Sequence, residues 1–353
     1  MNYCLKLLIV LVGLIARETV FAQEKQYQVR TIAFYNCENL FDTVKDPINR
    51  DEEWTPQGAR AWNQKKYQQK LMNVARVLSQ IGREENPVLP SIIGVAEVEN
   101  RQVLEDLVQQ SSLQRGDYGI VHFDSPDRRG IDVGLLYARK HFVLLQSTKH
   151  TLYLYDQRQK AKDSSAQRRI YTRDQLLVSG LLEGEEVHFI VNHWPSRVGG
   201  EKLSSVNREA AAALNRKIID SLQRINPQAK IITMGDLNDG PFNTSVKKIL
   251  QTEGDRTKVQ PQGLFNPMDK MAKNGYGTLA YRDHWDIFDH LILTEAFLGK
   301  DYSSWCYWKA QIFQKPFMIQ TTGQYQGYPL RNTTNEPGFS DHFPVYVLLL
   351  RQW

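Results

Sequence analysis

The sequence predicts a layered α/β fold in which two central β-sheets are covered by helices. Short runs of β-branched and aromatic residues outnumber the helical patterns along the chain. The helical patterns come in sets between pairs of these runs, whereas a doubly wound sheet would alternate strand and helix throughout. No glycine-rich phosphate loop follows any predicted strand, so we expect no nucleotide cofactor.

The first residues predict a secretory signal peptide, which we exclude from the fold. Lys6 precedes an apolar stretch from Leu7 to Ile15, and Val20-Phe21-Ala22 places small residues where a signal peptidase cleaves. The stretch is too short to span a bilayer, and a buried N-terminal helix is the alternative interpretation. We therefore expect a secreted or periplasmic protein after cleavage near Ala22.

Residues 23–353 are expected to form one domain, because no linker, repeat or low-complexity tract divides them. We also expect a monomer. No second long apolar run follows, so no stable membrane anchor is expected. Cys37 and Cys306 lie in apolar, strand-like stretches, where we expect buried free thiols. A net charge of +5 permits an acidic substrate but does not require one.

Each predicted element rests on its periodicity. Apolar runs predict strands over Val29–Tyr35, Ser91–Val98, Tyr118–Phe123, Ile131–Tyr137, Phe142–Gln146, Leu176–Leu182, Val187–Asn192, Lys230–Met234, Ile287–Leu293 and Val345–Leu350. Helical spacing covers about Ala61 to Ile81, Arg101 to Gln110 and Val206 to Ile225. The last helix carries an apolar face, and Ser204 or Ser205 is expected to cap its start.

Polar residues close five of the apolar runs. Asn36 follows the strand 31–35, and Glu97 follows the strand 92–96. Three further segments late in the chain are Asn192-His193-Trp194, Gly235-Asp236-Leu237-Asn238 and Ser340-Asp341-His342. Strands that repeatedly deliver a carboxylate, amide or imidazole into a loop predict a site assembled at one edge of a sheet.

These residue types suit metal-assisted hydrolysis of a phosphate ester. A divalent cation neutralises the phosphate oxygens, and Mg²⁺ prefers oxygen ligands such as Asn36, Glu97 and Asp341. His193 and His342 can supply acid–base chemistry when a carboxylate steers each ring. Each of these residues alone has a simpler explanation as a strand end or helix cap.

The combination of motifs resembles the endonuclease/exonuclease/phosphatase superfamily, the group of DNase I, apurinic endonucleases, sphingomyelinases and inositol-phosphate 5-phosphatases. The resemblance covers about Val29 to Leu350 and implies a four-layered α/β/β/α sandwich with two central mixed sheets. In order, the motifs are Phe34-Tyr35-Asn36-Cys37-Glu38-Asn39-Leu40-Phe41-Asp42, Val95-Ala96-Glu97-Val98, Arg129-Gly130-Ile131-Asp132-Val133, Asn192-His193-Trp194, Gly235-Asp236-Leu237-Asn238, Phe288-Asp289-His290 and Ser340-Asp341-His342.

The resemblance implies that Asn36 and Glu97 hold Mg²⁺, or Mn²⁺ or Ca²⁺, with Asp341 as a further ligand. Asp236 would orient or deprotonate the attacking water, and Asn238 would bind the scissile phosphate. Two departures stand near the ligands. Ala96 replaces the family's usual Gln before the metal-binding Glu, and Glu38 leaves a second, weaker metal position open.

The resemblance also implies roles for the two histidines. His342 would contact a phosphate oxygen and be held by Asp289. His193 would be the second imidazole, near the attacking or leaving oxygen, and Asp132 would steer it.

Basic and aromatic residues give two further hypotheses about the substrate. The segment Gln157–Arg173, including Arg168 and Arg169, is either a solvated loop or a contact to the phosphate backbone, and Arg129 is expected to bind substrate. The aromatic group Tyr276, Tyr281 and Trp285 is either core or a surface that stacks on bases or a sugar ring.

The leading functional interpretation is a secreted, metal-dependent phosphodiester hydrolase, with a nuclease acting on DNA or RNA as the first choice. The alternative is a phosphoesterase for a small or lipid substrate, similar to sphingomyelinases or inositol-phosphate phosphatases. A non-catalytic binding module is disfavoured, because such a protein would have no reason to hold this complete set of polar residues.

Overall fold

The computed structural model describes residues 26–156 and 168–352 and contains two large mixed sheets. The first sheet is six-stranded, in the order β16-β17-β1-β2-β4-β3. Its strands are β1 (Tyr27–Leu40), β2 (Ile92–Val98), β3 (Tyr118–His122), β4 (Asp132–Ala138), β16 (Cys306–Ile312) and β17 (Val345–Gln352). Strand β1 is parallel to β2 and antiparallel to β17.

The second sheet is seven-stranded, in the order β11-β12-β15-β10-β9-β8-β5. Its strands are β5 (Phe142–His150), β8 (Gln175–Leu182), β9 (Glu185–His193), β10 (Ile231–Asp236), β11 (Thr252–Glu253), β12 (Leu264–Phe265) and β15 (Asp289–Thr294). Strand β10 is parallel to β9 and antiparallel to β15, so this sheet is mixed as well.

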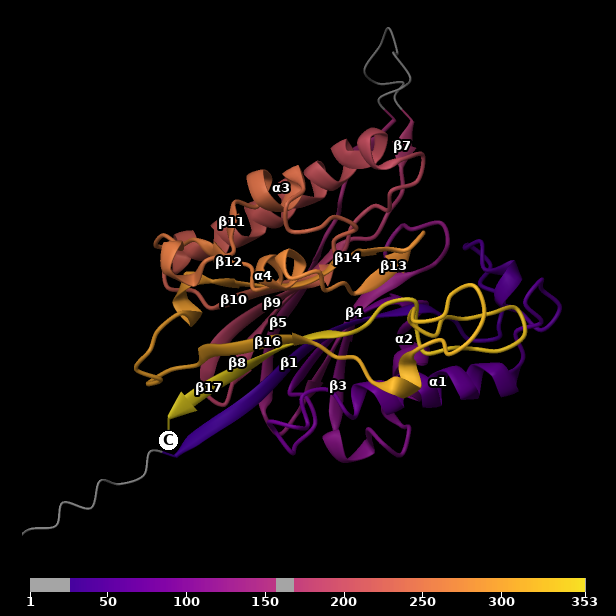
Figure 1. Ribbon diagram of the computed structural model, residues 1–353, viewed down its shortest axis with the longest axis horizontal. Coiled ribbons are helices and arrows are strands. Elements are labelled where there is room, and N and C mark those ends of the chain that lie inside the picture. Colours follow the sequence, from indigo (N-terminus) through magenta and orange to yellow (C-terminus); the bar gives the residue numbers. More distant parts are fainter. Residues whose placement is uncertain (1–25, 157–167, 353) are drawn as a thin grey trace, which may run out of the picture.

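Helices cover the outer face of each sheet, which gives four layers (Figure 1). Helices α1 (Gln64–Leu78) and α2 (Arg101–Val108) lie on the first sheet, and α3 (Glu201–Ile225) lies on the second. The remaining elements are short: α4 (Met268–Lys273), the pair β6 (Leu154–Tyr155) and β7 (Arg169–Ile170), the hairpin β13 (Leu279–Tyr281) and β14 (His284–Asp286), the π-helical turn Ser245–Ile249, and 3₁₀ turns at Glu52–Trp54, Gln114–Gly116, Arg256–Lys258, Glu295–Phe297 and Pro316–Met318.

Three buried clusters separate the four layers. Along β1, Ile32 and Phe34 face the second sheet, while Ala33 and Tyr35 belong to the cluster shared with α1 and α2. Alternate residues of a strand point to opposite faces, so a strand buried on both faces must be apolar throughout. This double burial explains why the central strands appear in the sequence as continuous apolar runs.

The ten expected strands are all present, and the four-layered sandwich is confirmed. Strand β16 and the two- and three-residue strands were not anticipated. The expected serine cap is wrong: α3 begins five residues earlier, after Gly200, and the Ser204 hydroxyl donates to the Gly200 carbonyl at 2.8 Å from within the helix. Cys37 and Cys306 are buried free thiols, as expected.

Two further expectations concern the signal peptide and membrane-spanning segments. Residues 1–25, which include the predicted signal peptide, lie outside the described residues. Within residues 26–156 and 168–352, no helix combines the length and apolarity needed to cross a membrane.

The close approach of the two sheets gives the first prediction. A Cβ on Gly94 of β2 would lie 2.6 Å from the Met234 sulfur on β10, so Gly94→Ala forces atoms into a filled layer. Overpacking of this kind costs about 1–3 kcal/mol, which urea denaturation followed by circular dichroism would measure. Gly240→Ala is the matched control, because its Cβ would meet no atom closer than 3.5 Å. Equal stability of both variants would show that the sheets are not in contact at Gly94.

Candidate active site

Three neighbouring strands of the second sheet place polar residues directly beside one another in the strand register. Asp236, the last residue of β10, pairs with His193, the last residue of β9, and with Asp289, the first residue of β15. Adjacent strands lie about 4.8 Å apart, so these three side chains form a row along one edge of the sheet. All three residues are at least 96% buried.

The first sheet brings its own polar strand ends to this row. The amide nitrogen of Asn36, on β1, donates a hydrogen bond to Asp236 Oδ2 at 3.1 Å, which joins the two sheets directly. Glu97, on β2, places Oε1 3.8 Å from His193 Nε2. The residues that sequence motifs identified on separate strands therefore converge where the edges of the two sheets meet.

Asp236 Oδ2 is the centre of this arrangement. His193 Nε2 lies 3.6 Å from it, and His342 Nε2 lies 3.9 Å from it on the other side. The second oxygen, Oδ1, accepts a hydrogen bond from the backbone of Asn238 at 2.9 Å. Burial raises the pKa of Asp236 to about 7, and the nearby Asp289 and Glu97 carboxylates add to this rise while His342 opposes it.

The backbone near the metal-ligand candidates is irregular. The pairing of β1 with β2 shifts register between Asn36 and Leu40, and Glu38, Asn39 and Glu97 have φ values of 49°, 53° and 58°. Positive φ is costly for residues other than glycine and is concentrated at functional sites. The bulge lets the Asn39 backbone donate to Glu97 Oε2 at 3.0 Å, which fixes the direction of that carboxylate.

His342 and Asp289 form a buried pair. His342 Nδ1 lies 2.7 Å from Asp289 Oδ2, so Nε2 is left to face Asp236. Burial alone would lower the pKa of His342, but the Asp289 carboxylate outweighs it and, with Asp236, raises the pKa well above its ordinary value. The structure thus places Asp289 against the histidine that the resemblance assigned to it.

His193 has the opposite environment. Burial lowers its pKa well below the ordinary value, and the positive charges of Arg173, Arg129 and His342 lower it further. Its Nδ1 is buried without a hydrogen-bond partner among the described residues. The site therefore holds one charged and one neutral imidazole on either side of the same carboxylate.

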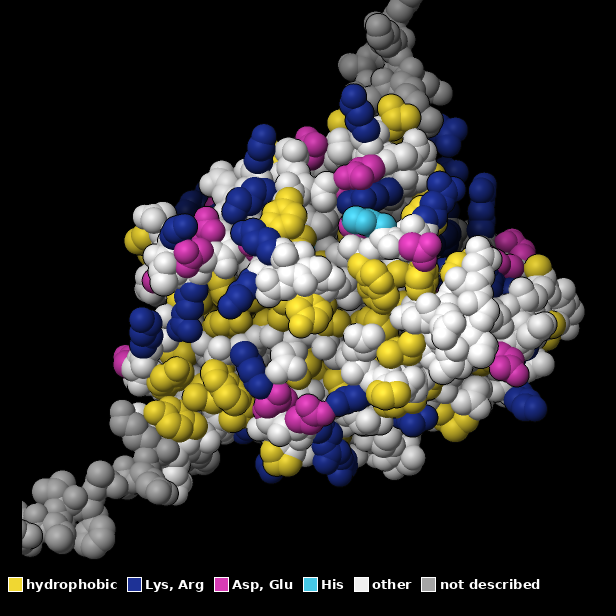
Figure 2. Space-filling model, viewed as in Figure 1, with side chains coloured by type: hydrophobic (Ala, Val, Ile, Leu, Met, Phe, Trp, Pro, Cys, Tyr) yellow, Lys and Arg dark blue, Asp and Glu magenta, His cyan; other side chains and the backbone are white. Residues whose placement is uncertain are grey.

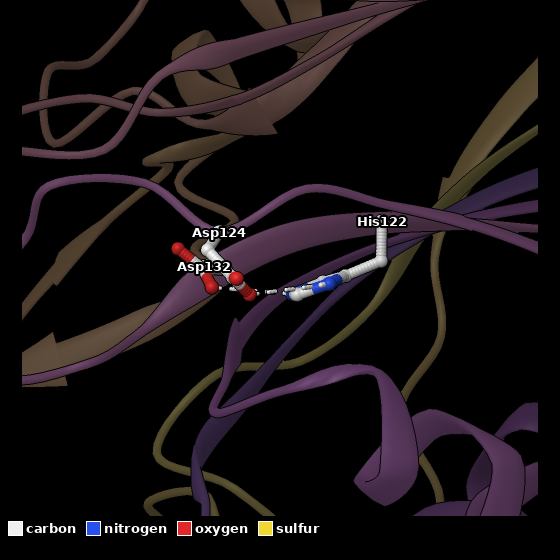
Figure 3. A group of neighbouring side chains, drawn as sticks. All are labelled: His122, Asp124 and Asp132. Carbon is white, nitrogen blue, oxygen red and sulfur yellow. Dashed lines mark hydrogen bonds and ion pairs between the residues drawn. The ribbon is translucent and has the colours of Figure 1, made fainter. Parts of the chain in front are cut away.

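The expected pairing of Asp132 with His193 is wrong. Asp132 Oδ2 lies 3.1 Å from Nε2 of a different histidine, His122 on the neighbouring strand β3 (Figure 3). Its Oδ1 accepts hydrogen bonds from the backbone and hydroxyl of Ser125. Both oxygens are thus occupied locally. His122, Asp124 and Asp132 each offer an atom that can ligate a cation, and sequence reasoning missed this group because no motif marks His122 or Asp124.

The oxygen donors of the site fit a divalent cation. Asn36 bonds to the Asp236 carboxylate, and the carboxylates of Glu97 and Asp341 lie 3.8 Å from His193 and 3.9 Å from His342. Carboxylates this close together repel one another unless a cation neutralises them. Oxygen ligands of this kind are those that Mg²⁺ prefers. Asn36, Glu97 and Asp341 would hold the ion, and Asp341 is the most accessible of the three.

Glu38, considered for a second metal position, supports a loop in this structure. Its Oε2 accepts a hydrogen bond from the Asn332 backbone at 2.8 Å and lies 4.0 Å from the fully buried ammonium of Lys70. Arg331, in the same loop, donates to Asp341 Oδ2 at 3.1 Å. Sequence reasoning missed Lys70 and Arg331, because neither belongs to a motif and both contacts join distant parts of the chain.

Asn238 and Arg173 contact the backbone that follows His193, and we call this group of residues the wall beside His193. The Asn238 side chain donates to the Trp194 carbonyl at 3.0 Å, which holds it next to the strand end. Arg173 is buried and donates to the carbonyls of His193 and Trp194 at 3.2 and 2.6 Å. Arg173 belonged to the basic run in the sequence, but nothing there distinguished its buried role from that of its exposed neighbours.

The expected substrate-binding arginines lie around this wall. The Arg129 side chain is half-exposed, and its positive charge lowers the pKa of His193. Arg168 is exposed and Arg169 is partly buried, and both line a cavity beside Pro195. Arg158, Lys160 and Lys162 lie outside the described residues. Of the aromatic group, Tyr276 and Tyr281 are exposed, whereas Trp285 stacks on Phe343.

Solved structures share this fold across nearly the whole chain. A humanised D. rerio TDP2 has a TM-score of 0.53 and 12% identity over 91% of this chain and 98% of its own. An endonuclease/exonuclease/phosphatase family protein from Bacteroides thetaiotaomicron has a TM-score of 0.51 and 16% identity over 93% and 96%. The human Nocturnin catalytic domain with bound sulfate has a TM-score of 0.50 and 15% identity over 93% and 98%.

Sequence comparison identifies the family. No curated protein matches the chain at a significant level. A family model described as Endonuclease/Exonuclease/phosphatase family matches residues 31–351, which include every strand of the two large sheets apart from the first residues of β1 and the last of β17. The chain therefore belongs to the endonuclease/exonuclease/phosphatase family.

Proposed function

We propose that the protein is an exported, Mg²⁺-dependent phosphodiester hydrolase that cleaves nucleic acid, and that it acts as a monomer. One observation carries the hydrolase assignment: the buried Asp236 carboxylate lies between two imidazoles in opposite charge states. Such a group can position water, accept its proton and stabilise a phosphate oxygen without rearrangement. The export proposal rests on the predicted signal sequence alone.

The side chains divide the chemistry. Charged His342, held by Asp289, donates a hydrogen bond to a phosphate oxygen, and Asn238 contacts the same phosphate. Asp236 orients the attacking water and takes its proton, while neutral His193 exchanges a proton with the attacking or leaving oxygen. A cation bound by Asn36, Glu97 and Asp341 would neutralise phosphate charge.

The choice of nucleic acid rests on charge near the site. Arg129, Arg168 and Arg169 surround the wall beside His193, and arginines provide much of the affinity of proteins for a phosphate backbone. One structurally similar protein, D. rerio TDP2, was solved with a single-strand DNA product. A small substrate is the second candidate, because a mannosyl-6-phosphatase from Bacteroides thetaiotaomicron has the same fold at a TM-score of 0.50.

Metal removal tests the ligand assignment. EDTA should abolish hydrolysis and Mg²⁺ should restore it, while Glu97→Ala should raise the Mg²⁺ concentration needed for half-maximal rate by about tenfold or more. Glu105→Ala is the control, since Glu105 is a half-exposed residue of α2 whose carboxylate pairs with Arg101. Full activity in EDTA would contradict a metal-dependent mechanism.

The His342–Asp289 pair predicts a shared kinetic effect. His342→Ala removes a positioned acid–base group and should lower kcat by about 10²–10⁴-fold. Asp289→Asn should produce a milder loss, and the double variant should be no worse than His342→Ala alone, because Asp289 acts through that ring. Steady-state kinetics of the three variants would measure this. Losses that multiply in the double variant would mean that Asp289 acts independently.

The raised pKa of Asp236 predicts an acid limb in the rate. The carboxylate is active only when deprotonated, so kcat/KM should rise as pH increases through about 7. A cation nearby favours the charged form, so the midpoint should move to lower pH as Mg²⁺ is raised. Rate–pH profiles at several Mg²⁺ concentrations would measure the shift. If the midpoint of the rate–pH profile does not change with Mg²⁺ concentration, Asp236 does not interact with the bound metal.

Salt dependence separates the two substrate candidates. Cleavage of a long single strand should fall steeply as salt rises, because each neutralised phosphate releases a counterion. Hydrolysis of a small chromogenic phosphodiester should respond much less. An enzyme that hydrolyses sugar or inositol phosphates but leaves DNA and RNA intact would favour the small-substrate function.

A further inference from the structure

A cavity of about 350 Å³ opens beside the candidate active site. Its walls are the segment from Arg168 to Arg173, the residues Pro195 and Ser196, Arg128, and the first turns of α3. Figure 2 shows Lys and Arg side chains gathered over the end of the molecule where Figure 1 labels β7.

Arg173 connects this cavity to the active-site edge. It donates hydrogen bonds to the carbonyls of His193 and Trp194, immediately before Pro195 in the cavity wall. Its remaining nitrogen donates to Asp127 at 2.9 Å, and this carboxylate neutralises its charge. Arg173 therefore has a structural role: its hydrogen bonds hold this wall of the cavity against the backbone of His193 and Trp194.

Two other arginines of the wall are held by aromatic rings. The Arg169 guanidinium lies over Tyr153 and Tyr171, 4.7 and 4.9 Å from their ring centres, and Arg128 lies over Tyr171 at 5.0 Å. Stacking occupies the flat faces of a guanidinium and leaves the N–H groups on its edge available, which suits two-pronged binding of a phosphate. The rings also hold the arginines in place before any ligand arrives.

The wall carries an excess of positive charge and unused donors. Among the described residues that line this cavity, Arg128, Arg168 and Arg169 accompany one carboxylate, Asp156, so positive charge exceeds negative there even if Asp156 neutralises one of them. Two buried donors of the same segment, Thr172 Oγ1 and Arg169 Nε, lack a hydrogen-bond partner among the described residues. Buried donors without acceptors are costly, so these two atoms mark local strain in the wall.

We propose that this cavity is a subsite for a second phosphate, attached through the body of the substrate to the phosphate that is cleaved. The inference rests on the proposed function and deepens it: the preferred substrate carries at least two phosphates. Charge-assisted hydrogen bonds from Arg128 and Arg169 recognise the second phosphate, and Arg168 adds positive charge at the rim. Either a nucleic-acid strand or a small bisphosphorylated molecule offers this chemistry.

A kinetic ratio tests the subsite. For each variant, kcat/KM is measured for a thymidine tetranucleotide and for bis-p-nitrophenyl phosphate, which has a single phosphate. Arg169→Gln and Arg128→Gln should each lower the ratio of the two values by about tenfold, since each removes a charged phosphate contact. Arg115→Gln removes an equal charge from the 3₁₀ turn before β3 and should leave the ratio unchanged. An unchanged ratio in Arg169→Gln and Arg128→Gln, with native thermal melting, would overturn the proposal.

A conservative variant separates local recognition from net charge. Arg169→Lys keeps the charge but loses the flat, two-pronged guanidinium, so its ratio should fall between those of the native protein and Arg169→Gln. A ratio identical to that of the native protein would mean that charge alone acts, and the stacked geometry would have no role in recognition.

Binding without catalysis distinguishes failure of the subsite from failure of the proposed function. In EDTA, fluorescence anisotropy measures affinity for a labelled tetranucleotide, and competition measures affinity for fructose 1,6-bisphosphate. Loss of either affinity by about tenfold in Arg169→Gln, but not in Arg115→Gln, supports the subsite even if no hydrolysis is detected, and the affected probe identifies the source of the phosphate. If the enzyme hydrolyses its substrate but Arg169→Gln leaves the affinities for the tetranucleotide and for fructose 1,6-bisphosphate unchanged, the proposed function stands and the subsite is rejected.

Discussion

The structure depends on a single buried carboxylate at the meeting edge of two sheets. Asp236 is 2% exposed, and burying an ionised carboxylate is costly unless hydrogen bonds and opposite charges surround it. Asn36 from the first sheet, the Asn238 backbone and the charged His342 ring supply those partners. The same contacts that stabilise the charge also fix the relative position of the sheets at the site.

The strand register explains why the site is well ordered. His193, Asp236 and Asp289 lie side by side because β9, β10 and β15 pair in sequence, and the backbone hydrogen bonds of a buried sheet leave little freedom to slip. The first sheet contributes a bulge, which aims Glu97, and Lys70 and Glu38 hold the loop before Asp341. Strands carry His193, Asp236 and Asp289, while the supported loop before β17 carries Asp341 and His342.

Much of the fold and the site could be predicted because both follow from local patterns. Continuous apolar runs mark strands buried on both faces, and polar residues such as Asn36 and Asp236 stand out where those runs end. The partner of Asp132 could not be predicted, since Ser125 and His122 reach it through side-chain geometry that no spacing encodes. Helix α3 begins after Gly200, and the Ser204 hydroxyl donates to the Gly200 carbonyl from within the helix, a competing use of serine that capping preference alone does not reveal.

The central claim is that two histidines flank one carboxylate in opposite charge states. The most direct test is an NMR titration of the metal-free protein with ¹³C-labelled histidine rings, with His193→Gln and His342→Gln used for assignment. At pH 7, the account predicts a positively charged His342 and a neutral His193. If both rings titrate together near pH 6.5, or if their charge states are reversed, the proposed division of roles around Asp236 is contradicted.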